Sequence, residues 1–137
     1  MTFVLDASLT LAWCFHDELS EPVARVRDQL ESEEAVAPRV HWDLEIWNGL
    51  LMAFRRGRIR SVEENARLIA ELPVERLDAP LEQALILAAR HQLSSYDALY
   101  LGLSLREAVP LATLDVRLAT AARREGLDVL GATSPRR

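Results

Sequence analysis

The chain contains no lysine, because all 16 of its basic residues are arginines. A P-loop NTPase and a phosphoacceptor receiver domain each need a lysine at the site, so both classes are excluded. A phosphatase of the haloacid dehalogenase type would carry a second acid two residues after the first, but that position holds Ser8. An HExxH zinc motif is also missing. These absences remove four common classes of enzyme site.

Cysteine and histidine are scarce as well. The single Cys14 cannot form an internal disulfide, and its apolar neighbours predict a buried structural thiol rather than a nucleophile. The three histidines form no metal-ligand set, so we expect structural or solvent-facing roles for them. The low cysteine content is typical of a cytoplasmic protein.

Long apolar runs are missing, and the longest is far shorter than a membrane span. Asp6 interrupts the apolar start of the chain and no basic segment precedes it, which argues against a signal peptide. Glycine and proline number only 5 and 6, while 27% of residues are charged, so a fibrous or disordered chain is excluded. We therefore expect a cytoplasmic protein with no membrane segment.

The residues that are present predict one globular domain spanning 1–137. Of the 137 residues 50% are hydrophobic, which is enough for a real core. The net charge of −5 gives no overall basic field to attract nucleic acid. Two arginines end the chain, and the run RRGRIR could form a local phosphate-binding surface for RNA through Arg55, Arg56, Arg58 and Arg60. A solvated helix end explains this spacing equally well.

Short apolar runs alternate with helical patterns along the whole chain. Strands are expected at 2–6, 35–38, 74–77, 110–114 and 127–131. Helices are expected at 8–16, 21–34, 39–57, 61–72, 80–91, 94–108 and 116–126. Continuous apolar strands are typical of strands buried on both faces. The pattern therefore predicts an α/β fold, a three-layer α/β/α sandwich with a parallel sheet of about five short strands.

Three aspartates stand where such a sheet would place a site. Asp6 ends the first strand and Asp115 follows the fourth, and ligand sites lie outside the carboxyl ends of parallel strands. Asp97 begins a helix that is apolar on nearly all sides, so its carboxylate needs a partner or a metal. Each aspartate could instead be a helix cap, and Ser94 stands at capping-box spacing from Asp97.

The helix at 39–57 supplies a further acid and a wide apolar surface. Glu45 and Asn48 are neighbours on one side and could project into a cleft, although a solvated polar face fits equally well. The apolar arc spans about 200°, more than one packing face needs. It predicts a homodimer whose interface includes Trp42 or Ile46.

If the acids converge, a cation must be present. Two like charges about 4 Å apart repel by about 4 kcal/mol at an effective dielectric of about 20. Magnesium takes such oxygen ligands, and metal-assisted attack of water on a phosphodiester follows from that chemistry.

Four segments together resemble a PIN domain, and within that group a VapC-type toxin ribonuclease of a toxin–antitoxin pair. They are FVLDASLTLAW, AVAPRVHWDLEIWNGL, HQLSSYDALYLGLS and PLATLDVRLATAAR, and they span almost the whole chain in family order. The resemblance implies an endoribonuclease dependent on Mg²⁺ (or Mn²⁺), an RNA substrate, a homodimer, and a cognate antitoxin that occupies the active-site groove.

The resemblance also implies roles for individual residues. The acidic quartet maps onto Asp6, Glu45, Asp97 and Asp115. Of these we expect Asp6, Asp97 and Asp115 to bind the metal. Supporting roles fall to Asn48, Thr113 and Ser8. Two alternatives stay open: an RNA-processing nuclease of the same family without an antitoxin, and a non-catalytic PIN-like interaction module.

Overall fold

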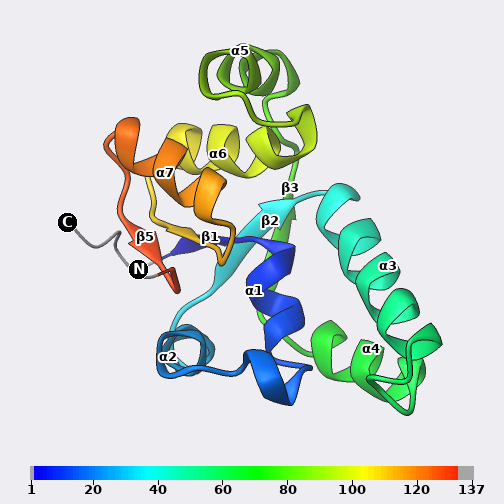
Figure 1. Cartoon of the computed structure of the whole chain (residues 1–137). Helices are drawn as coiled ribbons and strands as arrows, with labels where there is room; N and C mark the ends of the chain where they lie inside the picture. The colour runs from blue at the N-terminus through cyan, green and yellow to red at the C-terminus, as the bar shows by residue number, and fades with distance from the viewer. Residues whose placement is uncertain (1, 133–137) are drawn as a thin grey trace.

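The computed structural model describes residues 2–132, and its centre is a five-stranded, fully parallel sheet (Figure 1). The strand order is β3-β2-β1-β4-β5. All five expected strands are present, at β1 (Phe3–Leu5), β2 (Ala35–Pro38), β3 (Val74–Leu77), β4 (Leu111–Ala112) and β5 (Val129–Leu130). The two C-terminal arginines, Arg136 and Arg137, lie outside the described residues.

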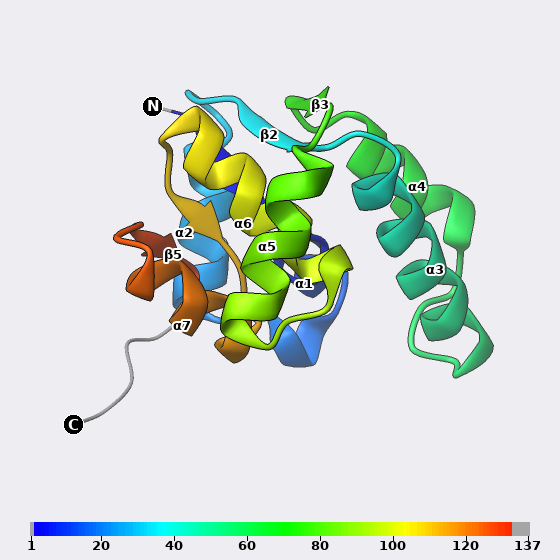
Figure 2. The ribbon, with the colours of Figure 1, turned by 90° about the horizontal axis from the view of Figure 1, so that it is seen from above.

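Helices cover both faces of the sheet, as predicted (Figures 1 and 2). On one side α3 contacts β2 and packs against α1 and α4, while α6 contacts β1, β2 and β4 on the other and is flanked by α5 and α7. The helices are α1 (Ala7–Ala12), α2 (Glu21–Gln29), α3 (His41–Arg55), α4 (Val62–Ala70), α5 (Leu81–His91), α6 (Ser95–Glu107) and α7 (Val116–Arg124). The first helix ends four residues earlier than expected, and a short 3-10 turn, η1 (His16–Glu18), follows it.

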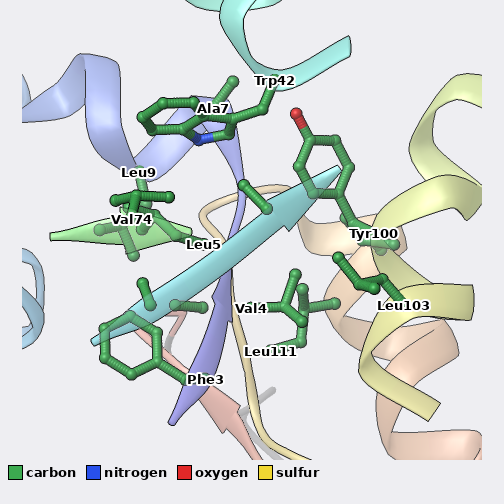
Figure 3. Packing of buried hydrophobic residues seen from close by; sticks show 14 of the residues in the cluster. Phe3, Val4, Leu5, Ala7, Leu9, Trp42, Val74, Tyr100, Leu103 and Leu111 are labelled. Carbon is green, nitrogen blue, oxygen red and sulfur yellow. The ribbon is translucent and has the colours of Figure 1, made fainter. Parts of the chain in front are cut away.

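The core fills both sides of the central strand. Phe3, Val4 and Leu5 of β1 are at most 1% exposed, because helices cover the sheet above and below them. Figure 3 shows these side chains packed with Leu103 and Leu111. The continuous apolar strands are therefore buried on both faces, as a parallel sheet requires.

The order of the strands creates one place where the chain changes direction across the sheet. From β1 the connections step outward to β2 and β3, and the chain then returns past β1 to β4. The carboxyl ends of β1 and β4 lie side by side at this switch point, where ligand sites of open α/β sheets form. Asp6 and Thr113 directly follow these two strands.

Helix α3 corrects one expectation. Trp42 and Ile46 are 0% exposed and belong to the core of this chain, so the prediction that either lies at a dimer interface is wrong. The apolar arc was too wide to show which edge faces the sheet. A different row of apolar side chains on α3 is exposed to solvent: Leu44, Trp47, Leu51 and Phe54.

A glycine brings α3 close to α1. A Cβ atom at Gly49 would overlap the end of the Leu11 side chain, which would then have to move. The contact holds α3 beside the helix that starts directly after Asp6. Among residues 2–132, no helix is both long enough and apolar enough to cross a membrane.

Candidate active site

Two hydroxyl groups hold Asp6 at the switch point. Thr113 Oγ1 donates to Asp6 Oδ2 at 2.6 Å and Ser8 Oγ donates to the same oxygen at 2.8 Å. The backbone N–H of Leu114 donates to Ser8 Oγ at 3.2 Å, which ties the loop after β4 to the loop after β1. The other carboxylate oxygen of Asp6, Oδ1, accepts neither of these two hydrogen bonds. The supporting roles expected for Ser8 and Thr113 therefore have a geometric basis.

The charge on Asp6 is unfavourable where it stands. The residue is 5% exposed, and burial raises its pKa to about 6 although the hydroxyls of Thr113 and Ser8 act to lower it. The negative charge of Glu45 raises the pKa further. A carboxylate so placed gains from a nearby cation.

A strained turn sets the direction in which α3 leaves the sheet. Val40 has φ 69° and ψ −52°, a conformation that β-branched residues rarely adopt. The backbone N–H of His41 donates to the carbonyl of Arg39 at 2.8 Å and closes a γ-turn around Val40. The helix begins at His41 instead of position 39, and His41 and Glu45 lie one turn apart on its first two turns.

Two aromatic side chains hold Glu45. Tyr100 Oη donates to Glu45 Oε1 at 2.6 Å, and His41 Nε2 lies 2.7 Å from the same oxygen. Figure 3 shows the ring of Tyr100 reaching from α6 with its hydroxyl toward α3. Burial alone would raise the pKa of Glu45, but the contacts with His41 and Tyr100 lower it below its usual value. Glu45 is therefore ionised at neutral pH.

Asp97 and Asp115 complete the acidic group, and both stand at the start of a helix: Asp115 is the N-cap of α7, and Asp97 lies in the first turn of α6. Asp115 Oδ1 accepts from the backbone N–H of Leu118 at 3.1 Å and caps α7, while Ser94 Oγ accepts from the backbone N–H of Asp97. Burial raises the pKa of Asp97, and the charge of Asp115 raises it further, followed by that of Glu45. Capping and membership of the acidic group are thus compatible.

The four carboxylates of the predicted quartet lie near enough to influence one another. The charge of Glu45 raises the pKa values of Asp6 and Asp97, and the charge of Asp115 raises the pKa of Asp97. Within residues 2–132, however, no three His, Cys, Asp or Glu side chains stand close enough together to hold a metal ion. The donors are all oxygens and two of the acids have raised pKa values, which fits a hard divalent cation such as Mg²⁺ or Mn²⁺.

Other predicted residues lie outside this group. Asn48 is exposed and its side chain makes no hydrogen bond within residues 2–132. The four arginines of RRGRIR are exposed around the far end of α3, and Arg55 is about 15 Å along the helix from Glu45 at about 1.5 Å per residue. Arg58 pairs with Asp17 at 2.7 Å and Glu18 at 2.9 Å. That these arginines contact RNA stays a prediction.

Sequence reasoning missed three aromatic residues around Glu45. Tyr100 was given no role, and His41 was expected to have a structural or solvent-facing role. Tyr96, which is 65% exposed, stacks on the His41 ring with centroids 5.5 Å apart. The available signals were helical: His41 stands four residues before Glu45, and Tyr100 stands three residues after Asp97.

A parallel α/β/α sandwich with four carboxylates at its switch point defines the class of protein. The sequence matches the PIN domain family over residues 3–124, and the chain belongs to that family. A search of curated protein sequences gave no match.

Solved structures share the fold over nearly the whole chain. PAE2754 from Pyrobaculum aerophilum is 20% identical, with a TM-score of 0.67 over 94% of this chain and 92% of that one. VapBC2 from Rickettsia felis, bound to a DNA fragment from their promoter, is 12% identical, with a TM-score of 0.59 over 94% and 97%. FitAcB from Neisseria gonorrhoeae is 16% identical, with a TM-score of 0.58 over 94% and 96%. At these identities the likeness establishes the fold alone.

Proposed function

We propose that this single domain, 1–137, is an endoribonuclease dependent on Mg²⁺ or Mn²⁺ and acts in the cytoplasm as a VapC-type toxin with a cognate antitoxin. The observation that carries the proposal is the acidic group at the switch point. Burial and the negative charges of the other acids raise the pKa values of Asp6 and Asp97. No arginine within residues 2–132 pairs with any of the four carboxylates. Membership of the PIN domain family supports the same activity.

Asp6, Asp97 and Asp115 would hold the cation. A divalent ion bound there polarises a phosphodiester and provides a water that is a good nucleophile at neutral pH. Thr113 and Ser8 fix Asp6 through Oδ2, and Leu118 fixes Asp115 through Oδ1, so each carboxylate is oriented with one oxygen outside these bonds. These bonds orient Asp6 and Asp115 before a cation binds, and the three carboxylates would have to draw closer together to hold it.

Glu45 has a different part in this proposal. His41 and Tyr100 hold one carboxylate oxygen and keep the pKa low, so the group is ionised and its orientation is defined. Its side chain is 37% exposed, which leaves it accessible to water. We assign Glu45 to orienting the attacking water and accepting its proton.

Cleavage of RNA by the purified protein tests the activity. Total cellular RNA is incubated with the protein in Mg²⁺, Mn²⁺ or EDTA, and the new ends are mapped. We expect discrete cuts with either metal and none in EDTA. Cuts that persist in EDTA, or no cuts with any metal, would reject the metal-dependent nuclease, and the second result would favour the non-catalytic interaction module.

An antitoxin would cover the site with cationic side chains, because no arginine within residues 2–132 pairs with the four carboxylates. A groove of about 280 Å³ between α1, α2 and α4 offers an apolar anchor for the same protein. We expect a small protein encoded immediately upstream to copurify and to inhibit cleavage. In the groove, Leu68→Asp should release it, whereas Leu85→Asp on α5, a similarly exposed leucine, should not. The absence of such a partner would favour an RNA-processing nuclease.

The homodimer is proposed through the exposed row of α3. Trp47 and Leu51 also line an apolar groove of about 330 Å³ between α3 and α4, so the row continues onto a second helix. Leu51→Glu should shift the protein from dimer to monomer in sedimentation equilibrium at micromolar concentration. A wild-type monomer would contradict the dimer, and a Leu51→Glu dimer would show that the interface lies elsewhere.

A further inference from the structure

A pocket that opens beside Asp115 is not explained by the acidic site. It lies between the end of α5 and the outer face of α7 and has a volume of about 170 Å³. The first residue of α7 that lines it, Val116, directly follows Asp115. The pocket therefore begins at the N-terminal end of α7, next in sequence to the proposed metal ligand Asp115. Its lining residues are His91, Val116, Arg117, Thr120, Ala121 and Arg124.

The charge of this lining is opposite to that of the neighbouring site. Two arginines and a histidine line the pocket, and no acid does, although the chain carries a net charge of −5. Arg117 and Arg124 make no ion pair within residues 2–132. Six other arginines are neutralised by an acid within the described residues: Arg25, Arg39, Arg58, Arg76, Arg90 and Arg106.

The two free guanidinium groups share one face of α7. Arg117 and Arg124 are seven residues apart, which is about two helical turns, and the small residue Ala121 between them makes the hollow. The hydroxyl of Thr120 donates to the carbonyl of Val116 at 2.8 Å, so the arginines are the donors available to a ligand. An arginine guanidinium can bind a phosphate oxygen pair with two parallel hydrogen bonds.

The opposite wall is rigid. The side chain of His91 is only 6% exposed, and its Nε2 lies 2.6 Å from Glu125 Oε2, which also accepts from Arg90 at 3.0 Å. Glu125 is thus occupied by two basic partners, and their hydrogen bonds lower its pKa. Glu125 is therefore already paired, which leaves the arginine charges of α7 for a ligand.

We propose that this pocket binds a backbone phosphate of the RNA strand next to the bond that is cut. The inference rests on the proposed nuclease function. It adds the path of the bound RNA strand, which would run from the acidic site past Asp115 and along α7. A strand that enters four carboxylates is repelled by them, and a cationic pocket directly beside them offsets that repulsion. The contact is to the backbone, so it carries no sequence information.

Binding of a short fluorescein-labelled single-stranded RNA, followed by anisotropy across a salt series, tests the proposal. The background is Asp97→Asn with Mg²⁺, so that RNA binds without being cut. The test variant is Arg117→Gln with Arg124→Gln. The matched control is Arg25→Gln with Arg67→Gln, which removes the same charge from exposed positions on α2 and α4, far from α7 in Figure 1.

We expect the α7 variant to bind RNA about tenfold more weakly, as the loss of charge-assisted bonds to one phosphate implies. The slope of log K against log salt should fall in magnitude by about 0.7, the value for one phosphate of a single strand. The control should match the parent in both. With Asp97 restored, the α7 variant should raise KM and leave kcat and the cut positions unchanged.

The outcomes separate this inference from the function on which it rests. A parent protein that does not bind RNA rejects the nuclease and the phosphate pocket together. If the parent binds RNA and the α7 variant keeps the same affinity and salt slope, only the phosphate pocket is rejected. The pocket would then be a candidate site for an acidic protein ligand. An equal loss in the control also rejects it, because the effect would then come from overall charge.

Discussion

Acidic side chains occupy two kinds of surroundings in this molecule. Away from the switch point, several lie against cations of the same chain: Asp43 pairs with Arg76 at 2.9 Å, and Glu125 pairs with Arg90 and His91. At the switch point, Asp6 receives hydroxyl groups, and the acids lie nearest to one another. Within residues 2–132 the only basic side chain there is an imidazole, His41 beside Glu45.

The difference separates structural acids from functional ones. An acid paired with arginine is satisfied by folding and has little left to offer a ligand. Asp6 and Asp97 are held in place but remain electrostatically unsatisfied, and their raised pKa values record that cost. Binding of a cation relieves it. Substitutions on the two sides should therefore have opposite consequences for activity and stability.

The largest difference should appear in RNA cleavage by Asp97→Asn and Asp43→Asn. The two changes remove the same charge, but only Asp97 interacts with Asp115 and Glu45. We expect Asp97→Asn to lower the metal-dependent rate by more than about 100-fold, because a proposed metal ligand is lost. Asp43→Asn should stay within a few-fold of wild type.

Circular dichroism of both variants checks that each is folded. The backbone N–H at position 97 can still donate to Ser94 Oγ when the residue is Asn, so the start of α6 should form. Wild-type activity in Asp97→Asn would mean that the Asp97 carboxylate has no part in the metal site, and the comparison between the two kinds of acid would fail.

The next effect concerns stability without metal. The pKa of Asp6 rises from 3.8 to about 6 on folding, so its contribution is most favourable below pH 4 and is lost as pH rises to 6. The penalty above pH 6 is about 3 kcal/mol at about 1.4 kcal/mol per pKa unit. Asp6→Asn should therefore raise the free energy of unfolding in EDTA at pH 7.5.

Urea unfolding from pH 4 to pH 8 measures this effect. The wild-type stability should fall between pH 4 and 6 more steeply than that of Asp6→Asn, and Mg²⁺ should stabilise only the wild type appreciably. A variant that is less stable than wild type at pH 7.5 in EDTA would show that the hydroxyl bonds of Thr113 and Ser8 outweigh the burial of the charge.

Features that depend on nearby residues in the sequence were easier to predict than features that depend on contacts between distant residues. The five strands were predictable because each is a short apolar run, and a parallel sheet buries both faces of every strand. Asp6 and Asp115 were predictable because each follows a short apolar run that contains a strand, β1 or β4. Local sequence carries this information without any knowledge of which elements meet.

Contacts between distant elements were not predictable in the same way. The bond from Tyr100 to Glu45 joins residues 55 positions apart, and the pairing of Arg76 with Asp43 depends on how α3 crosses β3. The apolar arc of α3 also did not show which edge is buried, because Ile46 and Trp47 differ by only about 100° around the helix. The turn at Val40 sets that rotation, and no sequence pattern predicted it.

A smaller effect should follow from Tyr100→Phe, which removes the phenol hydroxyl that donates to Glu45. That hydrogen bond helps to lower the pKa of Glu45, so its loss raises the pKa. We expect the acidic limb of the pH–rate profile to move to higher pH, while the rate at neutral pH stays within a few-fold of wild type because Glu45 is still ionised there. Tyr96→Phe, which keeps the ring on His41, is the control and should leave the profile in place. An unmoved acidic limb in Tyr100→Phe would mean that Glu45 does not act as the base.

The smallest effect is expected on the structural side of the comparison, in Arg76→Gln. The Arg76 side chain is 28% exposed, donates to Asp43 at 2.9 Å and lies 4.6 Å from the centre of the Trp42 ring. Its loss should lower the free energy of unfolding by about 1–2 kcal/mol, because a half-buried carboxylate loses a charged partner. The loss should be the same in EDTA and in Mg²⁺, since Asp43 is not among the acids proposed to meet the cation. Urea unfolding under both conditions measures it, with Arg67→Gln on α4 as an exposed arginine control. If the loss depended on Mg²⁺, the Asp43 pair would belong to the metal site, and the division between paired and unpaired acids would have to be redrawn.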